Sequence, residues 1–137
     1  MLRIGMIGAG WVTQHHLKAY QQLAARAKVV AIADPLAEAR DRRAHTYAIP
    51  AAYADAAEML AREKLDAVDI ATPRETHVAM CELAASKGLA ILCQKPLAPN
   101  LPQAQALVQS LAPGHPADGA RKLAVSSALP IDRALAR

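Results

Sequence analysis

Short apolar runs alternate with amphipathic stretches over most of the chain. The apolar runs lie at 2–7, 29–33, 67–71 and 89–93. The stretches between them carry apolar residues at helical spacing and predict helices at 11–27, about 36–45, 54–63 and about 75–86. Strands that alternate with helices of this length imply right-handed βαβ units. We therefore predict an α/β fold built on a doubly wound parallel sheet.

The length of 137 residues suits a single domain. We place the regular structure in residues 1–111. Residues 112–137 are predicted to form an irregular tail, because prolines and glycines crowd 113–119 without any periodicity. Within this tail, the run 122–126 is compatible with one more short strand.

The composition is that of an ordinary globular protein, with 53% hydrophobic and 20% charged residues. Charges interrupt every apolar stretch before it reaches the roughly 18–20 residues of a membrane span. The N-terminus has no signal-peptide pattern. Cys81 and Cys93 cannot form a disulfide framework. We therefore expect a cytoplasmic protein that neither enters nor binds a membrane.

The formal net charge of +4 raises the question of nucleic-acid binding. However, the basic residues are scattered, aromatic residues make up only 3% of the chain, and phenylalanine is absent. Side chains on which bases could stack are therefore scarce. We expect no nucleic-acid partner.

The first strand runs into a glycine-rich turn, Gly8-x-Gly10-x-x-Thr13, that precedes the first helix. This is the position of dinucleotide-binding glycines. The first glycine permits a tight turn, and the second lets the backbone approach a pyrophosphate at the positive end of the helix. Thr13 stands where a third glycine or alanine is usual. A plain strand–turn–helix connection would use the same glycines.

Asp34 ends the second strand a little over twenty residues after the glycines. A carboxylate there can accept hydrogen bonds from both adenosine ribose hydroxyls and repels a 2′-phosphate, which favours NAD over NADP. Arg40, Arg42 and Arg43 lie near enough to weaken that preference. The alternative role of Asp34 is to cap a helix that begins at Pro35.

The histidines give no sign of a metal site. His15 and His16 are adjacent and face different sides of a helix, so we expect both to be solvated. His77 and Cys81 are spaced i, i+4, but two ligands do not make a zinc site. We expect Cys81 to pack in the core and predict no metal.

Several motifs together resemble the N-terminal domain of the Gfo/Idh/MocA oxidoreductases, a Rossmann fold that binds NAD(P). They are Gly8–Ala9–Gly10, Asp34, Thr72–Pro73 followed by His77, and Cys93–Gln94–Lys95–Pro96. The resemblance covers residues 1–111. It implies hydride transfer to or from a sugar, polyol or related hydroxy compound, with Lys95 as the catalytic residue that contacts the reacting hydroxyl. The cofactor-binding residues that it implies are Gly8, Ala9, Gly10, Trp11, Val12, Asp34, Thr72, Pro73, His77 and Gln94.

The chain departs from the family pattern at identifiable places. Gln94 replaces the glutamate of the Glu-Lys-Pro signature, Arg74 stands where a small polar residue is usual, and the second, substrate-binding domain of the family has no counterpart in this sequence. Two alternatives therefore stay open: a catalytically silent NAD-binding module that serves as sensor or scaffold, and a truncated gene product. The resemblance also allows for a homo-oligomer and for a cis peptide before Pro96.

Overall fold

The structure is a computed structural model that describes residues 1–112 and 123–126. Within these residues, the strands form one sheet in the order β3-β2-β1-β4-β5-β6, and every neighbouring pair is parallel. This confirms the predicted doubly wound α/β class. The strands are β1 (Leu2–Ile7), β2 (Ala27–Ala33), β3 (Ala51–Tyr53), β4 (Ala67–Ile70), β5 (Ala90–Gln94) and β6 (Leu123–Ser126).

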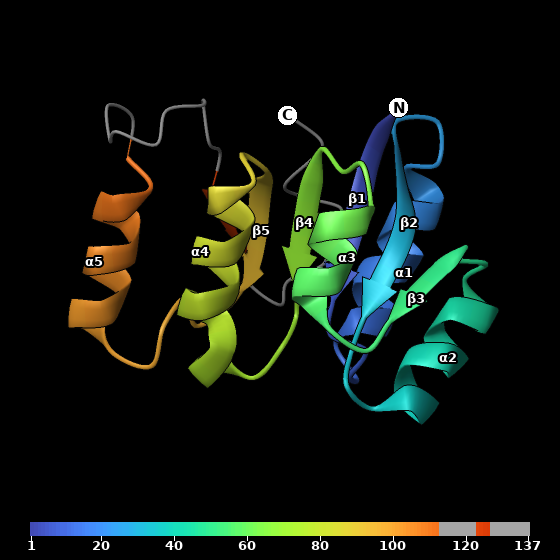
Figure 1. Cartoon of the computed structure of the whole chain (residues 1–137), viewed down its shortest axis with the longest axis horizontal. Coiled ribbons are helices and arrows are strands. Elements are labelled where there is room, and N and C mark those ends of the chain that lie inside the picture. The colour runs from blue at the N-terminus through green and yellow to red at the C-terminus, as the bar shows by residue number, and fades with distance from the viewer. Residues whose placement is uncertain (113–122, 127–137) are drawn as a thin grey trace.

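Helices cover both faces of this sheet, as Figure 1 shows for α1 and α3 on opposite sides. One buried cluster packs the sheet against α3, α4 and α5, and a second packs it against α1 and α2. Successive β1 residues Met6 and Ile7 belong to different clusters, as the alternation of side chains along a strand requires. The helices are α1 (Thr13–Gln22), α2 (Ala37–Thr46), α3 (Ala56–Arg62), α4 (His77–Ser86) and α5 (Leu101–Ser110), with a 3₁₀ turn η1 (Arg74–Thr76) before α4.

Some element boundaries differ from the sequence prediction. The helix expected at 11–27 ends at Gln22, and Ala27 instead begins β2 in register with Leu2. Alanine favours a helix locally, so at Ala27 the pairing with Leu2 of β1 overrides the local preference. No element was expected at β3 or α5. At three residues, β3 is too short to show a period and is recognisable only beside β2.

Several local signals are realised as expected. Gly88 has a φ of +72° just after α4 and ends that helix. Residues 123–126 of the predicted tail form the strand β6, which pairs with β5, while 113–122 and 127–137 of that tail lie outside the described residues. No helix in the described ranges is long and apolar enough to cross a bilayer.

The strand order leaves an opening beside the site. β1 and β4 are neighbours in the sheet although they are far apart in sequence. The chain leaves β1 for one face and β4 for the other, so the loops after these two strands diverge. In doubly wound sheets this divergence leaves a crevice at the carboxyl ends of the strands, where ligands bind.

Candidate functional site

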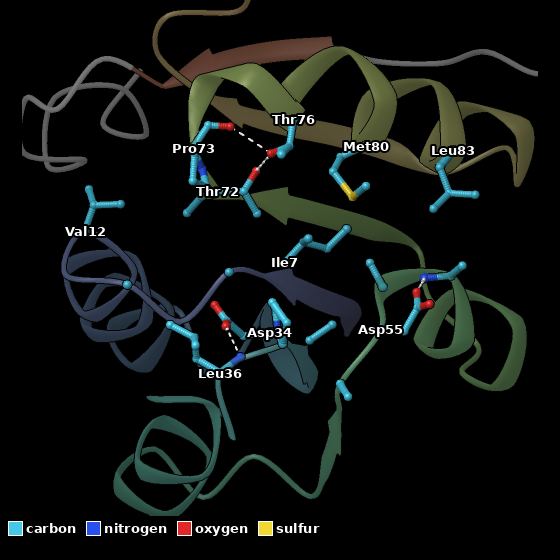
Figure 2. Close-up of a pocket in the computed structure, with 18 of the residues that line it drawn as sticks. Ile7, Val12, Asp34, Leu36, Asp55, Thr72, Pro73, Thr76, Met80 and Leu83 are labelled. Atoms are coloured by element: carbon cyan, nitrogen blue, oxygen red, sulfur yellow. Dashed lines mark hydrogen bonds between the residues drawn. The ribbon is translucent and has the colours of Figure 1, made fainter. Parts of the chain in front are cut away.

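A cavity of about 780 Å³ occupies this crevice. Figure 2 shows Asp34 and Leu36 on one side of it and Thr72, Pro73 and Met80 on the other. The sequence-predicted residues that line it are Gly8, Gly10, Trp11, Val12, Asp34, Thr72 and Pro73. The structure therefore brings most of the predicted cofactor residues to one space, although they come from three separate connections.

The two glycines of the loop after β1 meet different surroundings. Gly8 has a φ of +105°, and a Cβ atom there would lie 2.4 Å from the carbonyl oxygen of Ala71. Any side chain is therefore excluded by both conformation and space. At Gly10, by contrast, an added Cβ would meet nothing within 4 Å. Gly10 thus leaves space open above the loop, where the backbone can approach a ligand closely.

Thr13 takes the place of the third glycine without obstructing the loop. It is fully buried as the first residue of α1, and its hydroxyl donates to the carbonyl oxygen of Gly8 at 3.0 Å. Val12, the N-cap of α1, provides no side-chain hydrogen bond to the first turn. Main-chain N–H groups at a helix N-terminus carry partial positive charge and favour an anion such as a phosphate.

The carboxylate of Asp34 is held by two backbone amides. Oδ2 accepts from the N–H of Ala9 at 2.7 Å, and Oδ1 accepts from the N–H of Leu36 at 2.8 Å. Each oxygen keeps a further lone pair, so ribose hydroxyls can still donate to it. The alternative capping role of Asp34 is not realised, because α2 begins at Ala37 rather than at Pro35, its N-cap is Leu36, and no side chain caps its first turn.

Two arginines of α2 reach the main chain around the site. Arg40 donates to the carbonyl oxygen of Asp34 at 3.2 Å, and Arg43 donates to that of Gly10 at 3.2 Å. Arg40 therefore stands close to Asp34, and Arg43 stands close to the glycine-rich loop. In this structure they support the backbone of the two loops.

Part of the cavity was missed by the sequence analysis. Pro35 and Leu36 follow β2, Ala54 follows β3, and Met80 and Leu83 project from α4. These mostly apolar groups suit the flat face of a purine. Ala54 could have been found from its place after a strand, but β3 itself was not predicted.

The turn after β4 is stabilised by its own hydroxyls. The Oγ1 atom of Thr76 lies 2.7 Å from the Oγ1 atom of Thr72 and donates to the carbonyl oxygen of Pro73 at 2.7 Å, as Figure 2 shows. Thr72 and Pro73 line the cavity, and Thr76 lines it from η1. The turn therefore presents a defined wall opposite Asp34.

His77 is buried behind the cavity and is not among its lining residues. Its Nδ1 atom lies 2.7 Å from the carbonyl oxygen of Pro96, and its Nε2 atom lies 2.8 Å from that of Thr72. Carbonyl oxygens only accept, so the ring nitrogen that carries the hydrogen is the one that donates, and the tautomer decides which carbonyl it serves. The ring of His77 therefore connects the turns after β4 and β5.

Lys95 lies in the exposed turn after β5, and the peptide bond between Lys95 and Pro96 is cis, as expected. Its N–H is shared between the carbonyl oxygen of Ser126 at 3.0 Å and the Oε1 atom of Gln94 at 2.8 Å. Neither Lys95 nor Gln94 lines the cavity. Ala9 also lies outside the lining and contributes through its N–H to Asp34.

The prediction that His16 is solvated is wrong. His16 is 4% exposed, and its Nδ1 atom lies 2.9 and 3.0 Å from the two carboxylate oxygens of Asp69 on β4. The hydroxyl of Tyr20 donates to the same carboxylate at 3.1 Å. Burial alone lowers the pKa of His16, but the hydrogen bond and the charge of Asp69 outweigh it and raise that pKa.

The neighbouring His15 is exposed as expected, and its ring meets that of Trp11 edge-on, with 4.6 Å between the centroids. Asp69 could have been noticed as a charge inside an otherwise apolar run. Its partner could not, because the two residues are 53 positions apart. Burial of Cys81 is confirmed; Cys93 is buried with it, and its pKa is raised by the neighbouring Cys81 thiol and by burial.

The matches with known proteins agree with this geometry. Residues 2–115 match the model of an oxidoreductase family with an NAD-binding Rossmann fold, GFO_IDH_MocA. The chain belongs to this family. A D-apiose dehydrogenase from Paraburkholderia graminis is 41% identical over 103 residues, which are 75% of this chain and 27% of that protein. An inositol 2-dehydrogenase from Rhizobium meliloti is 38% identical over 96 residues, 70% of this chain and 28% of that protein.

Solved structures are similar over almost the whole chain. An Agrobacterium radiobacter oxidoreductase in complex with NAD+, L-tartaric acid and magnesium has a TM-score of 0.82 at 31% identity, covering 90% of this chain and 34% of that one. The WlbA dehydrogenase from Bordetella pertussis, in complex with NADH and UDP-GlcNAcA, has a TM-score of 0.81 at 26% identity, covering 91% and 36%. The chain thus spans about a third of the length of these relatives.

Proposed function

We propose that this chain is the NAD(H)-binding part of a Gfo/Idh/MocA oxidoreductase that transfers hydride to or from a carbon bearing a hydroxyl group. One observation carries the proposal. The loop of Gly8 and Gly10 opens at the N-terminus of α1 into the same cavity that Asp34 borders. In a ligand that carries both a pyrophosphate and a ribose diol, the pyrophosphate would bind at the glycine-rich loop and the diol would donate to Asp34.

In this proposal, different residues bind different parts of the cofactor. Main-chain N–H groups at the start of α1 face the pyrophosphate, and the open space at Gly10 lets it approach. Asp34 accepts from the adenosine ribose hydroxyls, while Leu36 and Met80 flank the adenine. The turn at Thr72 and Pro73 supports the nicotinamide half. The bound nicotinamide supplies the hydride acceptor or donor.

Lys95 is the proposed catalytic residue. Its side chain stands in an exposed turn at the carboxyl end of β5, next to β4 in the sheet. An ammonium group there can donate a hydrogen bond to the reacting hydroxyl or carbonyl oxygen and exchange a proton with it. The relatives named for D-apiose and inositol suggest a sugar or a cyclic polyol as substrate.

Calorimetric titration with NAD and NADP tests the cofactor assignment. We expect wild type to bind NAD more tightly than NADP, because Asp34 repels the 2′-phosphate. Asp34→Ala should weaken NAD binding by roughly ten- to a hundredfold. This corresponds to the loss of about 1.5–3 kcal/mol that hydrogen bonds to a charged group contribute. Glu82→Ala, at an exposed carboxylate of α4 that does not line the cavity, is the matched control. Indistinguishable binding of both cofactors to wild type and Asp34→Ala would refute the assignment.

A second candidate function is a catalytically silent NAD-binding module. Gln94 favours it, because an amide replaces the charged side chain of the Glu-Lys-Pro signature. Absorbance of the reduced nicotinamide separates the two functions when sugars and polyols are added to the chain with NAD. Substrate-dependent reduction that Lys95→Ala abolishes supports the enzyme. Tight NAD binding without any turnover supports the silent module.

A further inference from the structure

A continuous set of buried and half-buried polar side chains connects α1, β4 and β5 next to the Lys95 turn. It consists of Asp69, Tyr20, His16 and Gln94. Asp69 is fully buried, and His16 and Gln94 are 4% and 7% exposed. From Asp69, contacts run to His16 Nδ1 at 2.9 Å, from His16 Nε2 to Gln94 Nε2 at 3.4 Å, and from Gln94 Oε1 to the N–H of Lys95 at 2.8 Å.

Donor and acceptor roles along this set follow from its two ends. The N–H of Lys95 can only donate, so the oxygen of the Gln94 amide must face it, and the NH₂ group must face His16. At the other end, the carboxylate of Asp69 accepts a hydrogen from Nδ1 of His16. The Nε2 atom of His16 is therefore an acceptor for the NH₂ group, which requires that it carry no proton.

A second proton on His16 changes this balance. The Nε2 atom would then be a donor that faces the donor NH₂ group of Gln94. The only acceptor that the Gln94 side chain can offer is its single oxygen, which already holds the N–H of Lys95. Rotation of the amide toward His16 leaves the N–H of Lys95 with only the carbonyl oxygen of Ser126.

We propose that Gln94 couples the protonation of His16 to the main chain of Lys95, which makes His16 a positioning residue for Lys95. While His16 carries its hydrogen on Nδ1 alone, the oxygen of Gln94 holds the N–H of Lys95. When Nε2 is also protonated, that oxygen turns to His16 and the Lys95 turn loses one of its two main-chain attachments. The significance of this coupling for hydride transfer rests on the proposed catalytic role of Lys95.

The groups around His16 determine the pH at which it gains its second proton. Asp69 faces His16 from β4 with a negative charge, and Tyr20 of α1 directs its hydroxyl to the same carboxylate. The thiol of Cys93, which belongs to β5, also lies near Asp69. Burial and Asp69 raise the pKa of Tyr20, and that of Cys93 is raised as well, so both stay neutral. The protonation is therefore centred on His16, and its pKa lies above the ordinary value of 6.5.

Nuclear magnetic resonance of the full chain labelled with ¹⁵N tests the coupling directly. The ring nitrogens of His16 report its tautomer and charge, and the backbone amide of Lys95 reports the hydrogen bond to Gln94. We expect the Nδ1–H tautomer at high pH, and an upfield shift of the Lys95 amide proton as His16 gains its second proton. Both signals should share one midpoint.

Three variants make the test specific. His16→Gln should abolish the titration of the Lys95 amide, while His15→Gln, at the exposed neighbour, should leave it unchanged. Gln94→Glu supplies two carboxylate oxygens, one for each donor, so His16 should still titrate while the Lys95 amide no longer follows it. The last variant does not depend on His16→Gln being folded.

Some outcomes would overturn the coupling. A Lys95 amide that stays constant while His16 titrates in wild type excludes it, and so does an Nε2–H tautomer at high pH. These measurements need neither cofactor nor turnover. Failure of NAD to bind in calorimetry would therefore refute the proposed function and leave the coupling intact. Normal NAD binding together with a Lys95 amide that does not follow His16 would refute only the coupling.

Discussion

At the scale of single residues, Gly8 and Gly10 are glycines for different reasons. Gly8 is required by the fold, since its φ is +105° and the Ala71 carbonyl fills the space of a Cβ. Gly10 faces open space, so its lack of a side chain benefits only a ligand. Within this one loop, Gly8 therefore serves the stability of the fold and Gly10 serves ligand binding.

Gly8→Ala and Gly10→Ala should show this separation. We expect Gly8→Ala to lower the free energy of unfolding by about 2–3 kcal/mol, because strain and a backbone clash combine. Gly10→Ala should change it by less than about 0.5 kcal/mol but should weaken NAD binding, since its Cβ occupies the space over the loop. Urea denaturation and calorimetric titration measure the two quantities. Equal loss of stability in both variants would contradict this account.

The pair of His16 and Asp69 predicts a pH-dependent stability. Because the pKa of His16 is raised in the folded chain, the pair stabilises the fold fully below the ordinary pKa of 6.5, and this contribution is lost as pH rises through the higher folded value. Asp69→Asn should remove that pH dependence and lower stability by about 1–3 kcal/mol. Denaturation of both proteins at a series of pH values checks the prediction, and His16→Gln should show the same flattened profile.

At the scale of elements, the first residue of α4 joins two turns. His77 contacts the carbonyl oxygens of Thr72 after β4 and of Pro96 after β5. These turns carry the wall of the cavity and the proposed catalytic Lys95. The helix therefore sets the spacing between cofactor and catalytic side chain in the proposed enzyme.

His77→Gln should loosen both turns, since a flexible glutamine side chain does not hold a polar group between the carbonyl oxygens of Thr72 and Pro96 as the rigid imidazole ring does. We expect a loss of about 1–3 kcal/mol in stability from the carbonyl left unpaired, and faster hydrogen exchange of amides in the turns after β4 and β5. His45→Gln, at an exposed residue of α2, is the matched control. Unchanged exchange in both turns would show that the ring contacts do not hold them.

At the scale of the whole molecule, the cavity depends on elements from both faces of the sheet. Its wall combines the loop before α1, the connection after β2, and residues of α3 and α4. A ligand in this space contacts several elements that separate on unfolding. Binding and global stability are therefore linked.

NAD should accordingly raise the melting temperature of the chain. Ligand at a hundred times its dissociation constant stabilises the folded state by about 2.7 kcal/mol. Calorimetric melts over a range of NAD concentrations measure this increase, and Asp34→Ala should reduce it. A melting temperature independent of NAD in wild type would count against the cavity as the binding site.

The local pattern predicted much of the fold and part of the site. Apolar runs predicted β1, β2, β4 and β5, and the residues just after strands predicted Gly8, Asp34 and Thr72, because parallel strands place their carboxyl ends at one edge. The helix at 11–27 was drawn too long, and β3 and α5 were missed. Alanine favours a helix locally, so the helical pattern continued to Ala27, which instead pairs with β1, and a strand of three residues is too short to show a period.

The sequence alone determined the class of fold, the glycine-rich turn and the family, because these depend on the period of apolar residues and on motifs contiguous in the chain. Only the tertiary structure decided that His16 is buried against Asp69, that Gln94 lies between His16 and Lys95, and that His77 connects two turns. Contacts between residues far apart in sequence arise from strand order and helix packing. Local periodicity carries no information about which distant residue will face a given side chain.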